Sequence, residues 1–453
     1  MLSTRLYISV GLLIAVCLCC WSTSRNVFVR SSETPHANLA ARTEDTGNDL
    51  VPAPMPDWFK FQSNDTVNGW INNLDNKAIT GHAWEIWGAI TTLTDQQHNG
   101  NKLPVYETWW SVQEALAPPG ATRAAILRNR KALQLETPKQ FGRMKEAFRA
   151  ARPPSTLFSS VKYNDSIKKL IDERKYNDGK ELARINTGWG ETKPIADRKI
   201  QDFNNDAVML KPVYRLIPAK SVSILPYWSG PSNSTNPSVP DPSTWTKKMV
   251  VIPPDLNIDV KNIKLQSADE PLPAIPLSAF YNIKLTKDDA ASLPKAQEGD
   301  YIILVAMHVS TREIDNWTWQ TFWWSLEKPT LPESAKNHVK APFDHYQVAV
   351  GYSFMTDPNN PDSLTLTCFN PYLETGFSDT DFVYTLGQRG IESNCMSCHR
   401  TAAWPGPDQR YAGNGVIDPG NPDIFGGKTK TDFLWGIADR VKQPPAQAPQ
   451  SSR

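Results

Sequence analysis

The spacing of apolar residues predicts helices in the first half of the chain. Apolar residues recur at helical spacing over 82–90, which predicts a helix packed on the core. The same spacing over 139–151 and 163–186 occurs among many charged residues, which is typical of amphipathic helices on a protein surface.

In the second half, the apolar runs become continuous and rich in β-branched residues, which is typical of strands. The runs 207–217, 248–252 and 301–309 predict strands, and 346–354 and 363–369 complete the β content. The run 301–309 is the clearest, and its unbroken apolar character predicts burial on both faces. Because no helices alternate with these strands, the sequence predicts an antiparallel or mixed sheet.

Together these elements predict an α+β fold with a mixed or antiparallel β-rich core and peripheral helices. A final helix is expected at 432–441, after a stretch rich in Pro and Gly. The expected organisation is a large α+β domain over 57–370, a loop-rich C-terminal segment over 371–442 packed on it, and a disordered tail over 443–453.

The N-terminus has the pattern of a targeting segment. Arg5 precedes an apolar run over 6–21, and small residues follow, which predicts a signal peptide or N-terminal anchor over 1–24. The run is short for a membrane-spanning helix, which needs about 20 apolar residues. Residues 25–56 are polar without periodicity and predict a flexible linker. We therefore expect an exported protein that meets a membrane only through this segment.

Composition and charge narrow the class of protein. The 453 residues include 48 Lys and Arg against 47 Asp and Glu, a formal net charge of +1. A nucleic-acid-binding protein would show a basic excess, so no nucleic-acid partner is expected. The 16 Trp and 37 Pro predict a loop-rich globule packed on aromatic residues.

One motif carries specific chemistry. Cys395-Met396-Ser397-Cys398-His399 reads Cys-x-x-Cys-His, the attachment signature of c-type haem. Two thiols at this spacing can both form thioethers with one porphyrin edge, and the histidine that follows can bind the iron from the proximal side. We expect one covalent haem c held by Cys395, Cys398 and His399.

Two other uses of the cysteine pair stay open. A structural zinc site needs further ligands, and only Cys368 and scattered histidines could supply them. A redox dithiol is expected at the start of a helix within a βαβ unit, and the sequence shows no such unit around the motif. Both readings are weaker than haem attachment, because only haem c needs Cys, Cys and His in this contiguous order.

The second axial ligand decides whether the iron has a coordination position open to small molecules. No Met or His follows His399, so a protein ligand must come from the preceding region. We favour His308, because it lies in the clearest predicted strand, where an imidazole is costly without a partner. Met307 should point to the opposite side of that strand. The other candidates are His82, His345, Met209 and Met355.

Several short segments resemble a family of bacterial exported monohaem c-type cytochromes of unassigned role. They are Trp84 with Trp87, 104–109, 210–214, and 307–309 with 316–322, ahead of a single C-terminal Cys-x-x-Cys-His. The resemblance spans most of residues 57–405 and implies haem c binding, export to the periplasm and electron transfer. Relatives tend to carry an acidic residue after the Phe of the Trp-rich stretch, whereas Trp323 and Trp324 follow here.

The expected function is single-electron transfer with a redox partner protein that the sequence does not name. The protein would be periplasmic, or anchored to the inner membrane by an uncleaved N-terminus. It differs from small all-helical cytochromes c, because hundreds of residues with predicted strands precede the motif. Two alternatives stay open: a haem oxidase or peroxidase with an open distal site, and a ligand-binding or sensor module that carries haem. No acid–base pair is recognisable near the motif, which favours the electron carrier.

Overall fold

The computed structural model describes residues 50–130, 133–136, 156–227, 247–256, 272–352, 370, 372, 395–406 and 417–445. All of them belong to one compact unit. The predicted signal segment, the predicted helix 139–151, the predicted strand 363–369, Met355 and Cys368 lie outside the described residues. Within the described part of the chain, no helix is both long enough and apolar enough to cross a membrane.

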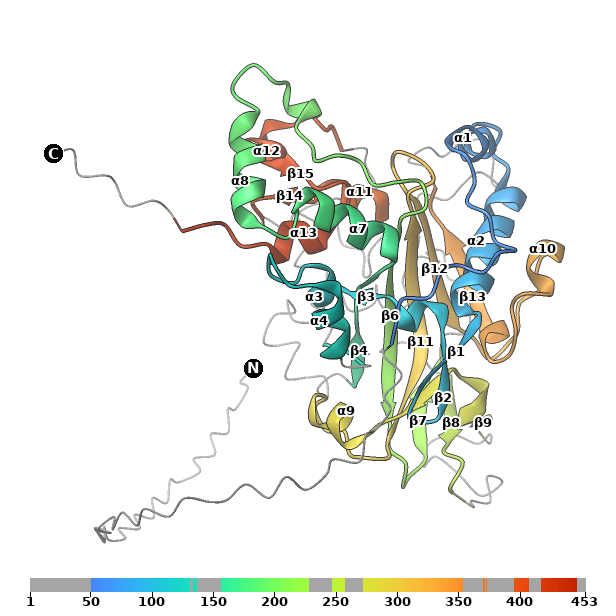
Figure 1. Ribbon diagram of the computed structural model, residues 1–453. Coiled ribbons are helices and arrows are strands. Elements are labelled where there is room, and N and C mark those ends of the chain that lie inside the picture. The colour runs from blue at the N-terminus through green and yellow to red at the C-terminus, as the bar shows by residue number, and fades with distance from the viewer. Residues whose placement is uncertain are drawn as a thin grey trace, which may run out of the picture. The chain divides into compact units, whose positions relative to one another are not determined.

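The core of the described structure is an antiparallel sheet of eight strands (Figure 1). Its strands follow the order β13-β12-β11-β6-β5-β3, with β10 paired to β11 and β4 paired to β6. Their bounds are β3 (Trp110–Ser111), β4 (Leu157–Ser159), β5 (Lys162–Tyr163), β6 (Val208–Ile217), β10 (Asn282–Lys284), β11 (Tyr301–Thr311), β12 (Thr318–Trp324) and β13 (Tyr346–Val350).

Three smaller sheets accompany it. They comprise β1 (Leu93–His98) with β2 (Asn101–Pro104), β7 (Ser223–Pro226) with β8 (Lys248–Ile252) and β9 (Ala274–Pro276), and β14 (Ala403–Trp404) with β15 (Thr429–Lys430). Short 3₁₀ helices occur at η1 (Val105–Thr108), η2 (Ile195–Asp197), η5 (Leu277–Ala279) and η6 (Phe343–His345).

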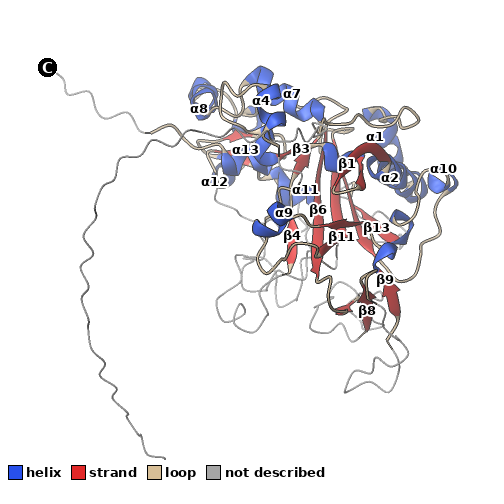
Figure 2. Cartoon of the chain, turned by 60° about the horizontal axis from the view of Figure 1, so that its bottom comes forward, coloured by secondary structure: helices blue, strands red, loops and turns tan. Residues whose placement is uncertain are grey.

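Eleven α-helices surround these sheets in the described residues. They are α1 (Asn64–Asn72), α2 (Asn76–Thr91), α3 (Val112–Ala115), α4 (Arg123–Arg128), α7 (Asp165–Arg174), α8 (Gly179–Gly188), α9 (Lys287–Ala291), α10 (Glu333–Lys336), α11 (Cys395–Arg400), α12 (Pro422–Phe425) and α13 (Trp435–Arg440). In both ribbon views, α1, α2 and α10 lie on one side of the large sheet, and α7, α8 and α11 to α13 lie on the other (Figures 1 and 2).

The predicted α+β class is confirmed. The predicted helix 82–90 lies within α2, and the strand predictions 207–217, 248–252 and 301–309 coincide with β6, β8 and β11 to within two residues. The predicted strand 346–354 is shorter, since β13 ends at Val350. The predicted helix at 432–441 is also shorter, because two residues before α13 have positive φ angles, which a helix does not accept.

Helix α2 packs on one face of the large sheet. It begins after Asp75, whose side chain accepts a hydrogen bond from the Ala78 N–H at 2.9 Å. The fully buried Trp87 ring stacks on Phe322 of β12, with centroids 4.3 Å apart and ring planes 20° apart. Its Nε1–H donates to the Phe343 carbonyl at 3.0 Å. These contacts make this face of the sheet a closed hydrophobic core.

The register of β11 and β12 assigns alternate residues to opposite faces. Met307 pairs with Phe322, so both lie on the α2 side. His308 pairs with Thr321, so both lie on the opposite face, which Trp319 shares because it is two residues from Thr321. Met307 and His308 therefore point to opposite sides, as the strand period predicts.

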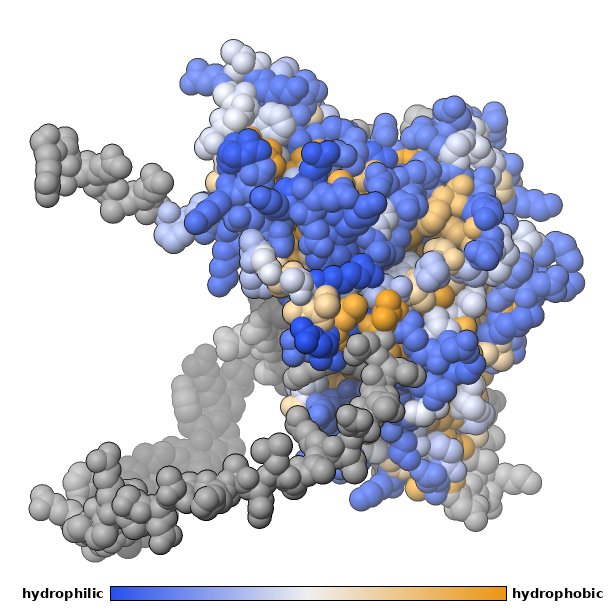
Figure 3. All heavy atoms as spheres, in the orientation of Figure 1, coloured by the Kyte–Doolittle hydropathy of each residue, from blue (hydrophilic) through white to orange (hydrophobic). Residues whose placement is uncertain are grey.

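The face that carries His308 borders a second hydrophobic cluster. This cluster joins Met209 of β6 and Trp319 of β12 to Met396 of α11 and Ile437 of α13. The sheet and the C-terminal helices thus share one core. The outer surface on the side shown in Figure 3 is mostly hydrophilic, with apolar side chains in small patches.

Candidate functional site

Helix α11 presents the Cys-x-x-Cys-His motif on one side. Residues three and four apart share a helix face, so Cys395 lies on the same side as Cys398 and His399. These three side chains are partly buried, whereas Met396 and Ser397 are fully buried in the core. Met396 and Ser397 anchor α11 in the core, and the two thiols and the imidazole lie on the other side of the helix.

The imidazole of His399 has a defined tautomer. Its Nδ1 lies 2.9 Å from the carbonyl oxygen of Phe433. A carbonyl only accepts hydrogen bonds, so Nδ1 carries the proton and Nε2 keeps its lone pair. This is the arrangement of an imidazole that binds a metal through Nε2 while a backbone carbonyl holds its other nitrogen.

Electrostatics keep this imidazole neutral. The pKa of His399 is lowered to about 4, mainly by burial and to a smaller extent by the electrostatic influence of His308 and Lys211, although the hydrogen bond to Phe433 acts in the opposite direction. The ring also lies against Trp319, with centroids 4.5 Å apart and planes at 47°. A neutral ring fixed by a carbonyl and an indole is ready to act as a ligand.

His308 and His399 lie on the same side of the large sheet. His308 pairs with Lys211 of β6 and Thr321 of β12, on the sheet face that borders α11. Trp319 shares that face and lies against the His399 ring. Two histidines far apart in the sequence therefore face the same region, one from the sheet and one from the motif.

The other candidate ligands differ in their surroundings. Both ring nitrogens of His82 are within hydrogen-bond distance of carboxylates, Nε2 at 2.9 Å from Glu313 and Nδ1 at 3.4 Å from Glu85. His345 stacks on Trp324, at the other end of β12 from Trp319. Neither lies against the motif.

Of the two methionines on the described strands of the large sheet, Met209 and Met307, only Met209 lies on the motif's side. Met307 is fully buried on the α2 side of the sheet. Met209 pairs with Ser310, on the same face as His308, and belongs to the cluster that contains Met396. Met209 is therefore the second candidate for an axial ligand.

Basic side chains share the face that carries His308. Lys211 and Arg215 are four residues apart on β6, so both point to the same side of the sheet. Burial lowers the pKa of the Arg215 guanidinium, which lies near Tyr372. Such cations suit the carboxylate groups of a haem, which would otherwise bring negative charge into this region.

The residues present fit a covalent haem. The thiols and the proximal imidazole share one side of α11, Nε2 of His399 is available, and a second imidazole faces the same region. For the zinc alternative, the described ranges contain no group of three or more His, Cys, Asp and Glu side chains placed to hold a metal ion.

Two features of the site had no clear sign in the sequence. The Trp-rich stretch predicted core packing, and Trp317, Trp323 and Trp324 are indeed buried, but Trp319 also lies against His399. The Phe433 carbonyl is a backbone atom, which no side-chain pattern marks. Comparison with known proteins adds no identity, because no family model, curated protein or solved structure matches this chain.

Proposed function

We propose that this protein is an exported monohaem c-type cytochrome that transfers single electrons between redox partner proteins. Cys395 and Cys398 would hold the haem through thioethers, and His399 would bind the iron through Nε2. When bound, haem supplies a one-electron ferric/ferrous couple.

The observation that carries the proposal is the pair of histidines. His399 offers a neutral ring with its Nδ1 proton committed to Phe433, and His308 lies on the face of β11 that borders α11. Two imidazoles on opposite sides of an iron would leave no coordination position for oxygen or peroxide. This arrangement favours electron transfer over oxidase or peroxidase chemistry.

Aromatic and apolar residues pack against the motif. Trp319 covers one side of His399, and Met396 below it is fully buried. A rigid, water-poor site lowers the reorganisation that accompanies each change in iron charge. The aromatic packing that makes up this core is thus consistent with a carrier that cycles between two oxidation states.

The test is an optical study of the protein expressed in a periplasm with haem c maturation. We expect a pyridine haemochrome typical of covalent haem, and low-spin spectra both as isolated and after dithionite. Absence of covalent haem would refute the proposal. A high-spin ferric form that readily binds cyanide would instead favour the haem enzyme.

A variant series tests the second ligand. His308→Ala should convert the ferric haem to a high-spin form that binds cyanide, because one axial ligand is lost. His345→Ala is the matched control, since His345 lies at the far end of β12 and should leave the spectrum unchanged. A low-spin spectrum in His308→Ala would exclude His308 as the ligand, and Met209→Leu would then be examined.

A further inference from the structure

The carbonyl that holds His399 belongs to an unusual turn. Asp432 and Phe433 have φ angles of 45° and 67°, a left-handed conformation that costs free energy for residues with a Cβ atom. Asp accepts this conformation more readily than most residues, but Phe does not. Tertiary contacts must therefore hold these two residues in the left-handed conformation.

The side chain of Asp432 supplies part of that support. Its carboxylate is buried and accepts hydrogen bonds from the Phe203 N–H at 2.9 Å, from Arg312 Nε at 3.3 Å and from Trp317 Nε1 at 3.3 Å. Three donors from two separate parts of the chain thus converge on one carboxylate. Together they fix the position of the residue that precedes Phe433.

Thr431, which precedes Asp432, holds the start of the turn through two hydrogen bonds. The Thr431 N–H donates to the Ala402 carbonyl at 3.0 Å, and Thr431 Oγ1 donates to the Leu434 carbonyl at 3.0 Å. Ala402 lies shortly after α11, so the turn is tied directly to the helix that carries the motif.

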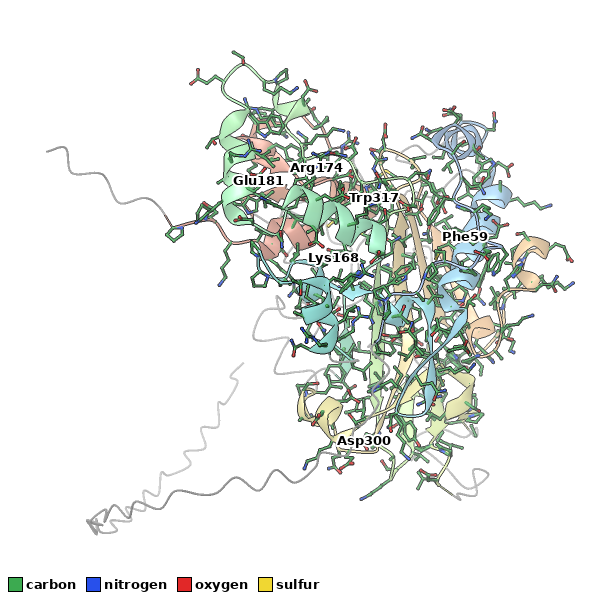
Figure 4. The ribbon with its side chains drawn as sticks, viewed as in Figure 1. Phe59, Lys168, Arg174, Glu181, Asp300 and Trp317 are labelled. Carbon is green, nitrogen blue, oxygen red and sulfur yellow. The ribbon has the colours of Figure 1, made fainter. Side chains whose placement is uncertain are left out.

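Two of the three donors flank the β11–β12 hairpin loop. Arg312 directly follows β11, and Trp317 directly precedes β12. Figure 4 labels Trp317 at this end of the sheet, on the side of the C-terminal elements. The same hairpin carries Trp319 against His399 and Asn316, which accepts a hydrogen bond from Arg400 at 3.3 Å.

We infer that Asp432 is a positioning residue for the proximal ligand: bound by Arg312 and Trp317, it fixes the left-handed turn that presents the Phe433 carbonyl to Nδ1 of His399. This inference rests on the proposed function, in which His399 binds the iron. A hydrogen bond from Nδ1–H makes the imidazole a stronger electron donor, which stabilises the ferric state and lowers the potential. Loss of the support should therefore raise the potential.

The test compares Asp432→Ala with Asp432→Asn and with the control Asp202→Asn. Asp202 also pairs with Arg312, through Nη2 at 3.4 Å, but its side chain is 37% exposed, whereas that of Asp432 is 3% exposed. We expect Asp432→Ala to shift the ferric/ferrous equilibrium towards ferrous about tenfold, which is about 59 mV for one electron. Asp432→Asn should show a smaller rise, because Asn tolerates the left-handed region and keeps one acceptor oxygen. Asp202→Asn should keep the wild-type potential.

A second measurement separates positioning from a general loss of structure. Hydrogen exchange of the His399 Nδ1 proton, followed by NMR in the ferrous protein, should be faster in Asp432→Ala than in wild type and Asp202→Asn. If Asp432→Ala does not fold, the potential and the Nδ1 proton exchange of Asp432→Asn test the inference instead. Wild-type potential and wild-type exchange in a folded Asp432 variant would overturn the inference.

Failure of the proposed function would look different. Wild-type protein without covalent haem would refute the cytochrome itself, whatever the Asp432 variants do. Wild-type protein with low-spin covalent haem, together with an unchanged potential in the Asp432 variants, would refute only the role of Asp432.

Discussion

The buried pair of His82 and Glu313 should make the stability of this protein fall in mild alkali. The His82 side chain is 1% exposed and that of Glu313 is fully buried, and Nε2 of His82 lies 2.9 Å from Glu313 Oε1. Burial alone would lower the pKa of His82, but its hydrogen bonds to Glu313 and Glu85, with their negative charges, raise it from 6.5 to about 9. The ring is therefore protonated in the folded protein at neutral pH.

The size and sign of the effect follow from proton linkage. A rise in the pKa from 6.5 to about 9 corresponds to about 3 kcal/mol of stabilisation, at about 1.4 kcal/mol for each tenfold change in proton affinity. The folded state binds this proton more tightly than the unfolded state. The contribution is thus fully present below pH 6.5 and is lost as the pH rises through about 9.

The assay is urea unfolding of the whole protein, followed by far-UV circular dichroism from about pH 6 to about pH 9.5. Wild-type protein should lose about 3 kcal/mol of unfolding free energy over this range relative to His82→Gln, which has no proton to lose at this site. His345→Gln is the control and should keep the wild-type alkaline loss, because burial lowers the pKa of His345 and its titration therefore removes no stability as the pH rises. Parallel profiles for wild type and His82→Gln between pH 6.5 and pH 9 would refute the reasoning.

Three further perturbations have expected outcomes. Trp87→Ala removes a fully buried ring stacked on Phe322 and should cost about 3–5 kcal/mol of unfolding free energy in urea, with the haem spectrum unchanged. Glu107→Gln leaves the buried Lys162 ammonium, 2.6 Å from Glu107, without its carboxylate and should cost about 3–5 kcal/mol; adding Lys162→Met should recover part of this loss. Cys398→Ala should shift the pyridine haemochrome band to the position of a haem with one thioether, while acid–acetone extraction still leaves the haem on the protein.

The elements that the sequence predicted well are those whose signal is local. Strands β6, β8 and β11 are continuous apolar runs, and such runs have few alternatives to a buried strand. The Cys-x-x-Cys-His motif is also a local signal, because its groups are contiguous, but its use for haem attachment stays a prediction. The shortened final helix was a wrong boundary, because apolar spacing over 433–437 continues through residues whose backbone is left-handed.

The geometry of the site could not be predicted, because it depends on register and on backbone atoms. His308 was a candidate from its place in a strand, but its position on the same side of the sheet as His399 requires α11 to pack on one particular face of the sheet. The Phe433 carbonyl has no side-chain signature, and the φ angle that directs it is set by contacts from distant parts of the chain. Such contacts are tertiary by nature, and a single sequence does not encode them in a readable pattern.

The β11–β12 loop links the large sheet to the C-terminal segment that carries the Cys-x-x-Cys-His motif. Two adjacent residues at the start of this loop form ion pairs on opposite sides of the sheet. Arg312 pairs with Asp432 near the motif, and Glu313 pairs with His82 on α2. The loop is thereby fixed from both sides of the sheet. In the proposed cytochrome, the hairpin would supply one axial ligand, His308, and would also orient the other, His399. The iron potential would then depend on the position of one hairpin, and the sheet and α2 would serve to hold that hairpin still.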